Sequence, residues 1–170
     1  MLLKLIGSLL LLAAGGYISL SVHRFERRRL TVLDGYIALI YYIKGQIDCY
    51  AMPLTDILTR ADPALLADCL GEAPDRMPAL LPAVWAEDAP MPALLQRSRL
   101  YLAPESERLL TAFSGELGTT RRAEQVARCD HYISVLGEER RRLYETLPAR
   151  LRTAGTLGIC ATLAATILLW

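Results

Sequence analysis

Residues 33–50 read LDGYIALIYYIKGQIDCY, and this stretch decides the fold. Apolar side chains recur in it at alternating steps of three and four residues, at Leu33, Tyr36, Ile40, Ile43, Ile47 and Tyr50. Because an α-helix completes a turn in about 3.6 residues, this spacing places them on one face. No proline interrupts residues 24–50. The pattern predicts a long helix that buries this face against a second helix.

A matching seam lies near the other end of the chain. It consists of Val126, Cys129, Ile133, Leu136, Leu143 and Leu147, again spaced by three and four residues except that Arg140 occupies one position. Two helices of this kind are expected to pack antiparallel, with shorter helices from 53–117 completing an all-α bundle. We expect no β-strand, since no stretch shows a clear alternation of apolar and polar residues.

Cap residues divide the segment between the two seams. Asp62 before Pro63 predicts the N-cap of a short helix, and Gly71 is expected to end that helix. A later helix is expected to end at Gly118 in the same way. Residues 72–92 contain five of the nine prolines, so only short helical pieces are expected there.

The two ends of the chain are apolar enough to lie in lipid. Leu5 to Val22 is a run of 18 residues without an ionised side chain, and Ala154 to Trp170 is a run of 17. As helices they would span about 27 and 25 Å, the lower end of what a bilayer core requires. The sequence therefore predicts a transmembrane helix at 1–22, a cytoplasmic all-α bundle domain at 23–153 and a transmembrane helix at 154–170.

The first apolar run has a rival interpretation as a cleaved signal peptide. Lys4 would be its charged region and Ala13-Ala14-Gly15 its small-residue cleavage site. The run continues to Val22, which is longer than a signal core needs, and the arginines that follow it oppose export. We favour the membrane span, and cleavage stays the alternative.

Basic residues gather next to the two apolar runs. Arginine beside a span is retained on the cytoplasmic face and attracts anionic lipid headgroups. The sequence therefore predicts a cytoplasmic bundle and six arginines at the membrane surface, namely Arg24, Arg27, Arg28, Arg29, Arg150 and Arg152.

Residues 30–119 are acidic by contrast, with six basic side chains and twelve acidic ones. Such a surface suits a basic partner. The candidate partner-binding residues are Asp56, Asp62, Asp68, Glu72, Asp75, Glu87 and Asp88. The simpler interpretation, which stays open, is that these acids only keep a helical domain soluble.

No residue pattern points to catalysis, a cofactor or a metal. Cys129-Asp130-His131 offers a thiol, a carboxylate and an imidazole, but neighbours on a helix point about 100° apart and cannot converge on one ion. Lipid headgroups or a solvated helix face explain the arginine runs 27–29 and 140–142 better than nucleic acid does. We expect a protein that is not an enzyme, and an enzyme with a membrane anchor is the alternative class.

Small residues recur in both apolar runs, and Gly158, Thr162 and Thr166 repeat every four residues in the second. Such residues let helices approach closely in a membrane, so a homo-oligomer stays open. The four cysteines contain no C-x-x-C pair, which is typical of a reducing compartment.

The succession of several short motifs resembles one known family. The motifs are Met1-Leu2-Leu3-Lys4-Leu5-Ile6-Gly7, Met52-Pro53-Leu54, Leu117-Gly118-Thr119 followed by Gln125, and Arg152-Thr153-Ala154-Gly155-Thr156-Leu157-Gly158. In their order and spacing the whole chain resembles the stage III sporulation protein AB family. One departure is Thr119-Thr120-Arg121-Arg122-Ala123-Glu124, where the family usually has a small residue, an acid, a base and an acid before the glutamine.

Members of that family are similar to the cytoplasmic helical domain of type II secretion protein F. The resemblance implies a scaffold subunit of the channel complex between mother cell and forespore, in the outer forespore membrane on the mother-cell side. It implies a secretion-type ATPase and other channel subunits of that complex as partners, and no catalytic residues. A platform subunit of a type II secretion or pilus system outside sporulation is the alternative, although secretion protein F usually contains two such domains.

Overall fold

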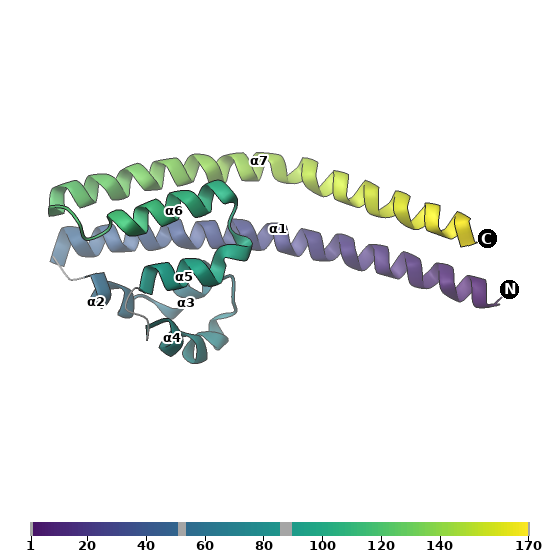
Figure 1. Cartoon of the computed structure of the whole chain (residues 1–170), viewed down its shortest axis with the longest axis horizontal. Coiled ribbons are helices and arrows are strands. Elements are labelled where there is room, and N and C mark those ends of the chain that lie inside the picture. Colours follow the sequence, from purple (N-terminus) through teal and green to yellow (C-terminus); the bar gives the residue numbers. More distant parts are fainter. Residues whose placement is uncertain (1, 51–53, 86–89, 170) are drawn as a thin grey trace. The chain divides into compact units, whose positions relative to one another are not determined.

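The computed structural model is all-helical, as the sequence predicts (Figure 1), and it describes residues 2–50, 54–85 and 90–169. No strand occurs in these ranges. Residue 53, where the predicted segment of shorter helices begins, lies outside them. The elements are α1 (Leu2–Tyr50), α2 (Leu54–Thr59), α3 (Pro63–Leu70), the 3-10 turn η1 (Pro74–Arg76), α4 (Met77–Trp85), α5 (Pro90–Ser98), the 3-10 turn η2 (Arg99–Tyr101), α6 (Pro104–Glu116) and α7 (Arg122–Leu169).

The chain forms two compact units. The bundle unit comprises residues 28–142, and the terminal unit comprises residues 1–27 together with 143–170. The described residues of the terminal unit are helical throughout and belong to α1 and α7. The domain boundaries that the sequence predicts, after residues 22 and 153, stay a prediction.

Membrane spans were predicted within the terminal unit. Across the part of the chain whose side chains are described, none of the helices has the length and hydropathy needed to cross a membrane. Many side chains of the predicted spans, Leu5 to Val22 and Ala154 to Trp170, lie outside the described residues. The two spans stay predictions.

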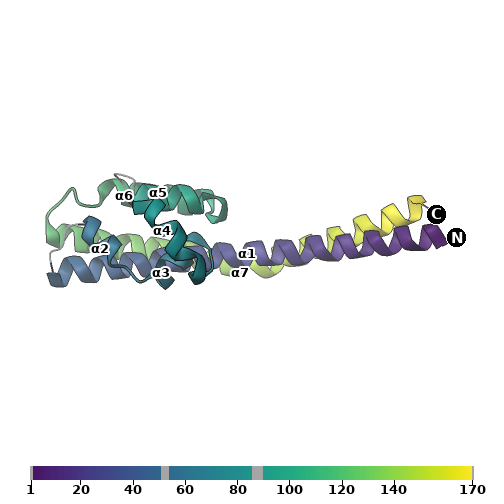
Figure 2. The same cartoon turned by 90° about the horizontal axis from the view of Figure 1, so that it is seen from below.

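Within the bundle unit, α1 and α7 lie side by side and antiparallel (Figures 1 and 2). Ion pairs show the direction, because residue numbers fall along α7 as they rise along α1. The pairs are Asp34 with Arg140, Lys44 with Asp130 at 2.6 Å, and Asp48 with Arg122 at 3.4 Å.

The predicted seam of α1 forms the centre of the core. Its buried members are Leu33, Tyr36, Ile40, Ile43 and Ile47, and α7 adds Cys129, Ile133 and Leu136. The prediction was wrong for Tyr50, which is 67% exposed. Because α7 begins at Arg122, which pairs with Asp48, it does not reach far enough along α1 to cover Tyr50.

The short helix α3 packs closely against α1 at Gly35. A Cβ atom at Gly35 would lie 2.7 Å from the backbone of both Asp68 and Cys69. Atoms of a folded protein do not approach so closely, so only glycine allows this helix contact. The contact also covers Cys69, which is fully buried, and burial raises the pKa of its thiol.

The expected helix ends are confirmed at three positions. The Asp62 side chain accepts a hydrogen bond from the N–H of Ala64 at 2.8 Å, as an N-cap of α3 should. Gly71 and Gly118 have left-handed φ angles of 63° and 82°. That backbone conformation favours glycine and closes α3 and α6.

Helix α5 is an element that the sequence analysis missed. Pro90 and Pro92 lie in its first turn, where a missing N–H costs no hydrogen bond. Its inner face holds Met91, Ala93, Leu94, Leu95 and Ser98, all buried. The Ser98 hydroxyl donates to the carbonyl of Leu94 at 3.0 Å and lies 2.6 Å from the Tyr36 hydroxyl. This buried pair joins α5 to α1, and burial raises the pKa of Tyr36.

Candidate functional site

The six predicted membrane-surface arginines are divided between the two units. Arg24, Arg27, Arg150 and Arg152 lie in the terminal unit and are exposed. Arg28 and Arg29 begin the bundle unit. Arg28 donates a hydrogen bond to the Tyr101 hydroxyl at 3.1 Å, and its guanidinium carbon lies 5.9 Å from the centre of that ring. Arg28 therefore ties η2 to α1.

The predicted partner-binding acids lie between α2 and η1, except Glu87 and Asp88, which fall outside the described residues. Asp62 caps α3, and a Glu72 carboxylate oxygen lies 3.5 Å from a guanidinium nitrogen of Arg76. A partner that bound either acid would compete with these contacts. The remaining members of the set are exposed without such a role, namely Asp56, Asp68 and Asp75.

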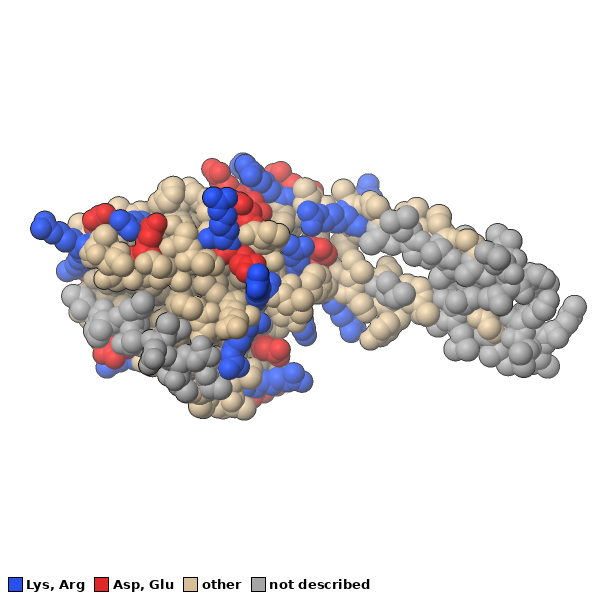
Figure 3. Space-filling model, viewed as in Figure 1, with Lys and Arg blue, Asp and Glu red and all other residues tan. Residues whose placement is uncertain are grey.

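Acidic and basic side chains are interspersed over the face of the bundle unit that Figure 3 shows. Ion pairs within the unit account for part of this mixing. Arg99 lies 2.6 Å from Glu107, and Arg128 lies 3.2 Å from Glu116. The acidic excess of residues 30–119 is partly balanced by Arg128, which lies outside that range.

Cys129, Asp130 and His131 have separate roles on α7. The Cys129 thiol is buried in the seam, and burial raises its pKa. Asp130 accepts a hydrogen bond from Lys44 at 2.6 Å, which raises the pKa of the lysine. The exposed His131 ring lies edge-on to Tyr132, with ring centres 5.5 Å apart. Among the described residues, no group of three His, Cys, Asp or Glu side chains could hold a metal ion.

Sequence reasoning treated Arg140 as an interruption of the seam and missed its partner. Arg140 pairs with Asp34 through two nitrogens, and its Nη2 lies 3.2 Å from Asp34 Oδ2. Together with the Lys44–Asp130 pair, this contact gives each helix one acidic and one basic member. On α1 these are Asp34 and Lys44, and on α7 they are Asp130 and Arg140. A slide of α7 that moved Arg140 toward Lys44 would bring like charges together. The signal in the sequence was the charged residue Arg140 at a seam position of α7.

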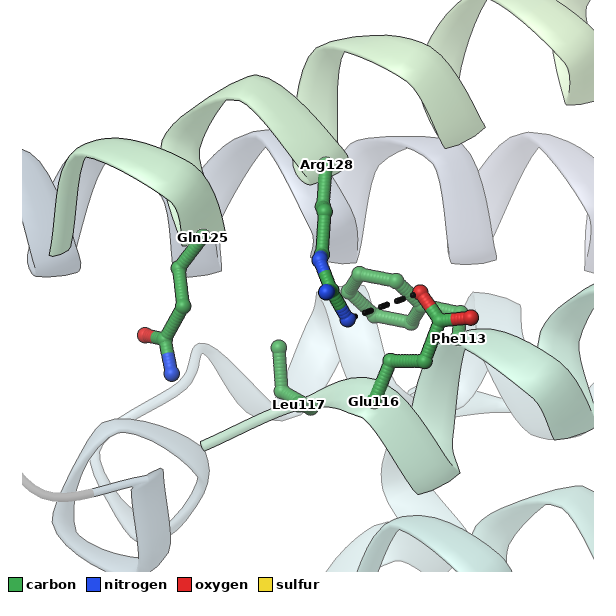
Figure 4. A pocket seen from close by; sticks show the side chains of 5 residues that line it. All are labelled: Phe113, Glu116, Leu117, Gln125 and Arg128. Carbon is green, nitrogen blue, oxygen red and sulfur yellow. Dashed lines mark hydrogen bonds and ion pairs between the residues drawn. The ribbon is translucent and has the colours of Figure 1, made fainter. Parts of the chain in front are cut away.

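Helices α6 and α7 meet around a small cavity (Figure 4), which is lined by Phe113, Glu116, Leu117, Gln125 and Arg128. Its volume of about 10 Å³ leaves room for about one water molecule. Arg128 connects the helices through Glu116, and Phe113 packs edge-on against Tyr132 with ring centres 5.2 Å apart. Small-molecule sites are larger, at about 300–1,000 Å³, so this cavity reflects helix packing.

Comparison with known families gives the identity. The family model of stage III sporulation protein AB matches residues 4–170, nearly the whole chain. The chain belongs to the stage III sporulation protein AB family. The resemblance of its motifs is thereby confirmed. Neither a curated protein nor a solved structure matches the sequence.

In this member of the stage III sporulation protein AB family, the Leu117-Gly118-Thr119 motif and Gln125 act at one place. Leu117 and Gln125 both line the cavity between α6 and α7. Gly118 supplies the left-handed turn, and the Thr119 hydroxyl donates to the carbonyl of Glu116 at 2.7 Å. The motif therefore ends α6 and leads the chain into α7.

Proposed function

We propose that this chain is a non-enzymatic scaffold, an assembly-platform subunit of the channel complex between mother cell and forespore. The family match over residues 4–170 is the observation that carries the proposal. The bundle unit supports the proposal because the side chains that could suggest catalysis have structural contacts. The Cys129 thiol packs in the core, and Asp130 pairs with Lys44.

In this proposal both apolar runs insert into the outer forespore membrane, with the bundle unit on the mother-cell side. Their length and the arginines beside them support insertion in this orientation. Cys49 is exposed at the end of α1 and provides a test. In a Cys160→Ser chain, an impermeant maleimide should label Cys49 only after the cells are permeabilised. Labelling of intact cells would contradict the orientation, and release by an alkaline wash would contradict insertion.

The partner in this proposal is the secretion-type ATPase of the same complex, which meets the exposed acids of the bundle unit. Asp68 and Asp75 allow a clean charge reversal, because neither caps a helix and both are exposed. The full chain with Asp68→Lys and Asp75→Lys should recover less ATPase in co-purification. Reversal of two other exposed acids of the bundle unit, Glu105→Lys and Glu138→Lys, is the matched control. Equal recovery with both variants would remove the docking proposal.

Time and place of expression test the assignment to sporulation. A fluorescent fusion of the full chain should mark the outer forespore membrane during engulfment. Uniform signal in the membrane of growing cells would instead indicate a general secretion role.

A further inference from the structure

An exposed apolar side chain lies at the turn between α5 and α6. Leu100, the central residue of η2, is 71% exposed. The two residues that follow η2, Leu102 and Ala103, are buried. Leu100 also borders a hollow of about 240 Å³, whose other lining residues are Leu70, Leu80, Tyr101, Arg97 and Glu72. The turn therefore presents apolar surface that the bundle unit does not cover.

Basic side chains surround Leu100. Arg97 and Arg99 precede it, and both are exposed. Arg99 uses its Nε for the 2.6 Å contact with Glu107, yet its side chain is 72% exposed. Arg28 donates a hydrogen bond to the hydroxyl of Tyr101, the residue after Leu100. An apolar tip with arginines and a tyrosine around it is the composition of a surface that lies in the headgroup region of a bilayer.

The position of η2 fits that interpretation. Within the bundle unit, η2 contacts Arg28, the first residue of that unit, through Tyr101. Arg28, which contacts η2, follows Val22, the last residue of the first predicted span, by only six residues. Six residues cover about 9 Å as a helix and at most about 21 Å when fully extended.

We propose that η2 is a further membrane contact, in which Leu100 enters the interface of an anionic bilayer and Arg97 and Arg99 bind lipid phosphates. The proposal rests on the membrane insertion proposed above. It adds a third attachment point, which lies in the bundle unit and is separated by many residues from either apolar run. Such a contact restricts how the bundle unit can tilt on the membrane.

The test measures the depth of three positions in the full chain, reconstituted in vesicles of phosphatidylcholine and phosphatidylglycerol. Each variant keeps one exposed cysteine for an NBD fluorophore, while Cys69 and Cys129 are buried. The label sits at Cys49 in Cys160→Ser, at Cys160 in Cys49→Ser, or at position 100 in Leu100→Cys with both exposed cysteines replaced by Ser. Lipids brominated near the glycerol or near the chain end quench at shallow or deep positions.

We expect shallow bromines to quench the label at position 100, deep bromines to quench it at Cys160, and neither to quench it at Cys49. Quenching at Cys160 with position 100 as unquenched as Cys49 would overturn the η2 contact and leave the spans intact. That result would also follow if η2 instead bound a protein. No quenching at Cys160 would refute the span, and the η2 proposal would fall with it.

A second variant tests the arginines. Arg97→Gln with Arg99→Gln in the Leu100→Cys chain should reduce the shallow quenching, because headgroup attraction is lost. Arg108→Gln, an exposed arginine on α6, is the matched control. Equal quenching in both variants would overturn the role of Arg97 and Arg99.

Discussion

Asp34 of α1 and Arg140 of α7 are paired through two nitrogens of the arginine, although 106 residues separate them in the chain. Both side chains are about half exposed. An ion pair at this exposure is screened by water, so it adds little to stability. The Lys44–Asp130 pair has the opposite orientation of charge, so a shift of one helix along the other would bring like charges together. The two pairs therefore favour one register of α1 and α7.

This relationship predicts a small and specific coupling. Asp34→Ala and Arg140→Ala should each lower the free energy of unfolding slightly, with a coupling of about 0.2–1 kcal/mol in a double-mutant cycle. Arg140→Glu should cost more than Arg140→Ala, because it places two acids opposite each other. Urea denaturation of the full chain in detergent measures all four values. A zero coupling would show that the pair has no role in stability.

Two glycines of α1 are expected to respond oppositely to alanine. Gly35→Ala should lower the free energy of unfolding by about 1–3 kcal/mol, because the new Cβ meets the backbone of α3 at 2.7 Å. Gly45→Ala should raise it by up to about 1 kcal/mol, because nothing lies within 4 Å and alanine favours the helix. Thermal unfolding of the two variants makes the comparison. Similar shifts would contradict the close contact between α1 and α3.

The buried hydroxyl pair predicts an asymmetric result. Tyr36→Phe should cost about 1 kcal/mol, because the Ser98 hydroxyl keeps the carbonyl of Leu94 as its acceptor. Ser98→Ala should cost more, about 1–3 kcal/mol, because it leaves the Tyr36 hydroxyl buried without its partner. The double variant should be closer to Tyr36→Phe than to Ser98→Ala. The reverse order in urea denaturation would contradict the pair.

Stability is expected to fall at alkaline pH through Cys69. Burial raises the pKa of its thiol in the folded chain, whereas the unfolded thiol ionises near 9.0. The unfolded state therefore binds fewer protons above that pH, and the folded state loses stability as pH rises, by at most about 1.4 kcal/mol per pH unit. Below the unfolded pKa this contribution is constant.

Cys69→Ala tests the assignment. Its free energy of unfolding should decline less steeply above about pH 9 than that of the unchanged chain, since one titrating group is gone. Cys49→Ala, at an exposed thiol, is the control for removing a cysteine outside the core. Parallel slopes for all three chains would show that Cys69 ionises equally in both states.

Much of the fold could be predicted from local signals. The steps of three and four residues from Leu33 to Ile47 depend only on helix geometry, so they marked the buried face correctly. Asp62 and Gly71 act on their own backbone, so their roles as caps needed no knowledge of the rest of the chain. The family resemblance needed only the order of the motifs.

The candidate site was harder to predict, because its contacts join distant parts of the chain. Arg28 was predicted to lie at the membrane surface, but its bond to Tyr101 needs η2 to fold beside α1. Leu100 gave no periodic signal, since a single exposed apolar residue is common on any surface. Arg97 and Arg99 are its neighbours in the sequence, but only the fold brings Arg28 to the adjacent Tyr101.

The sequence by itself determined which face of α1 is apolar, where α3 begins and ends, where α6 ends, and to which family the chain belongs. Only the tertiary structure decided what those faces meet. Gly35 and Gly45 are the same residue in the same helix, yet one is pressed against α3 and the other is open. Tyr50 continues the spacing of the seam but lies beyond the start of α7 and is exposed. Periodicity is a property of one helix, whereas burial depends on the length and position of its neighbours.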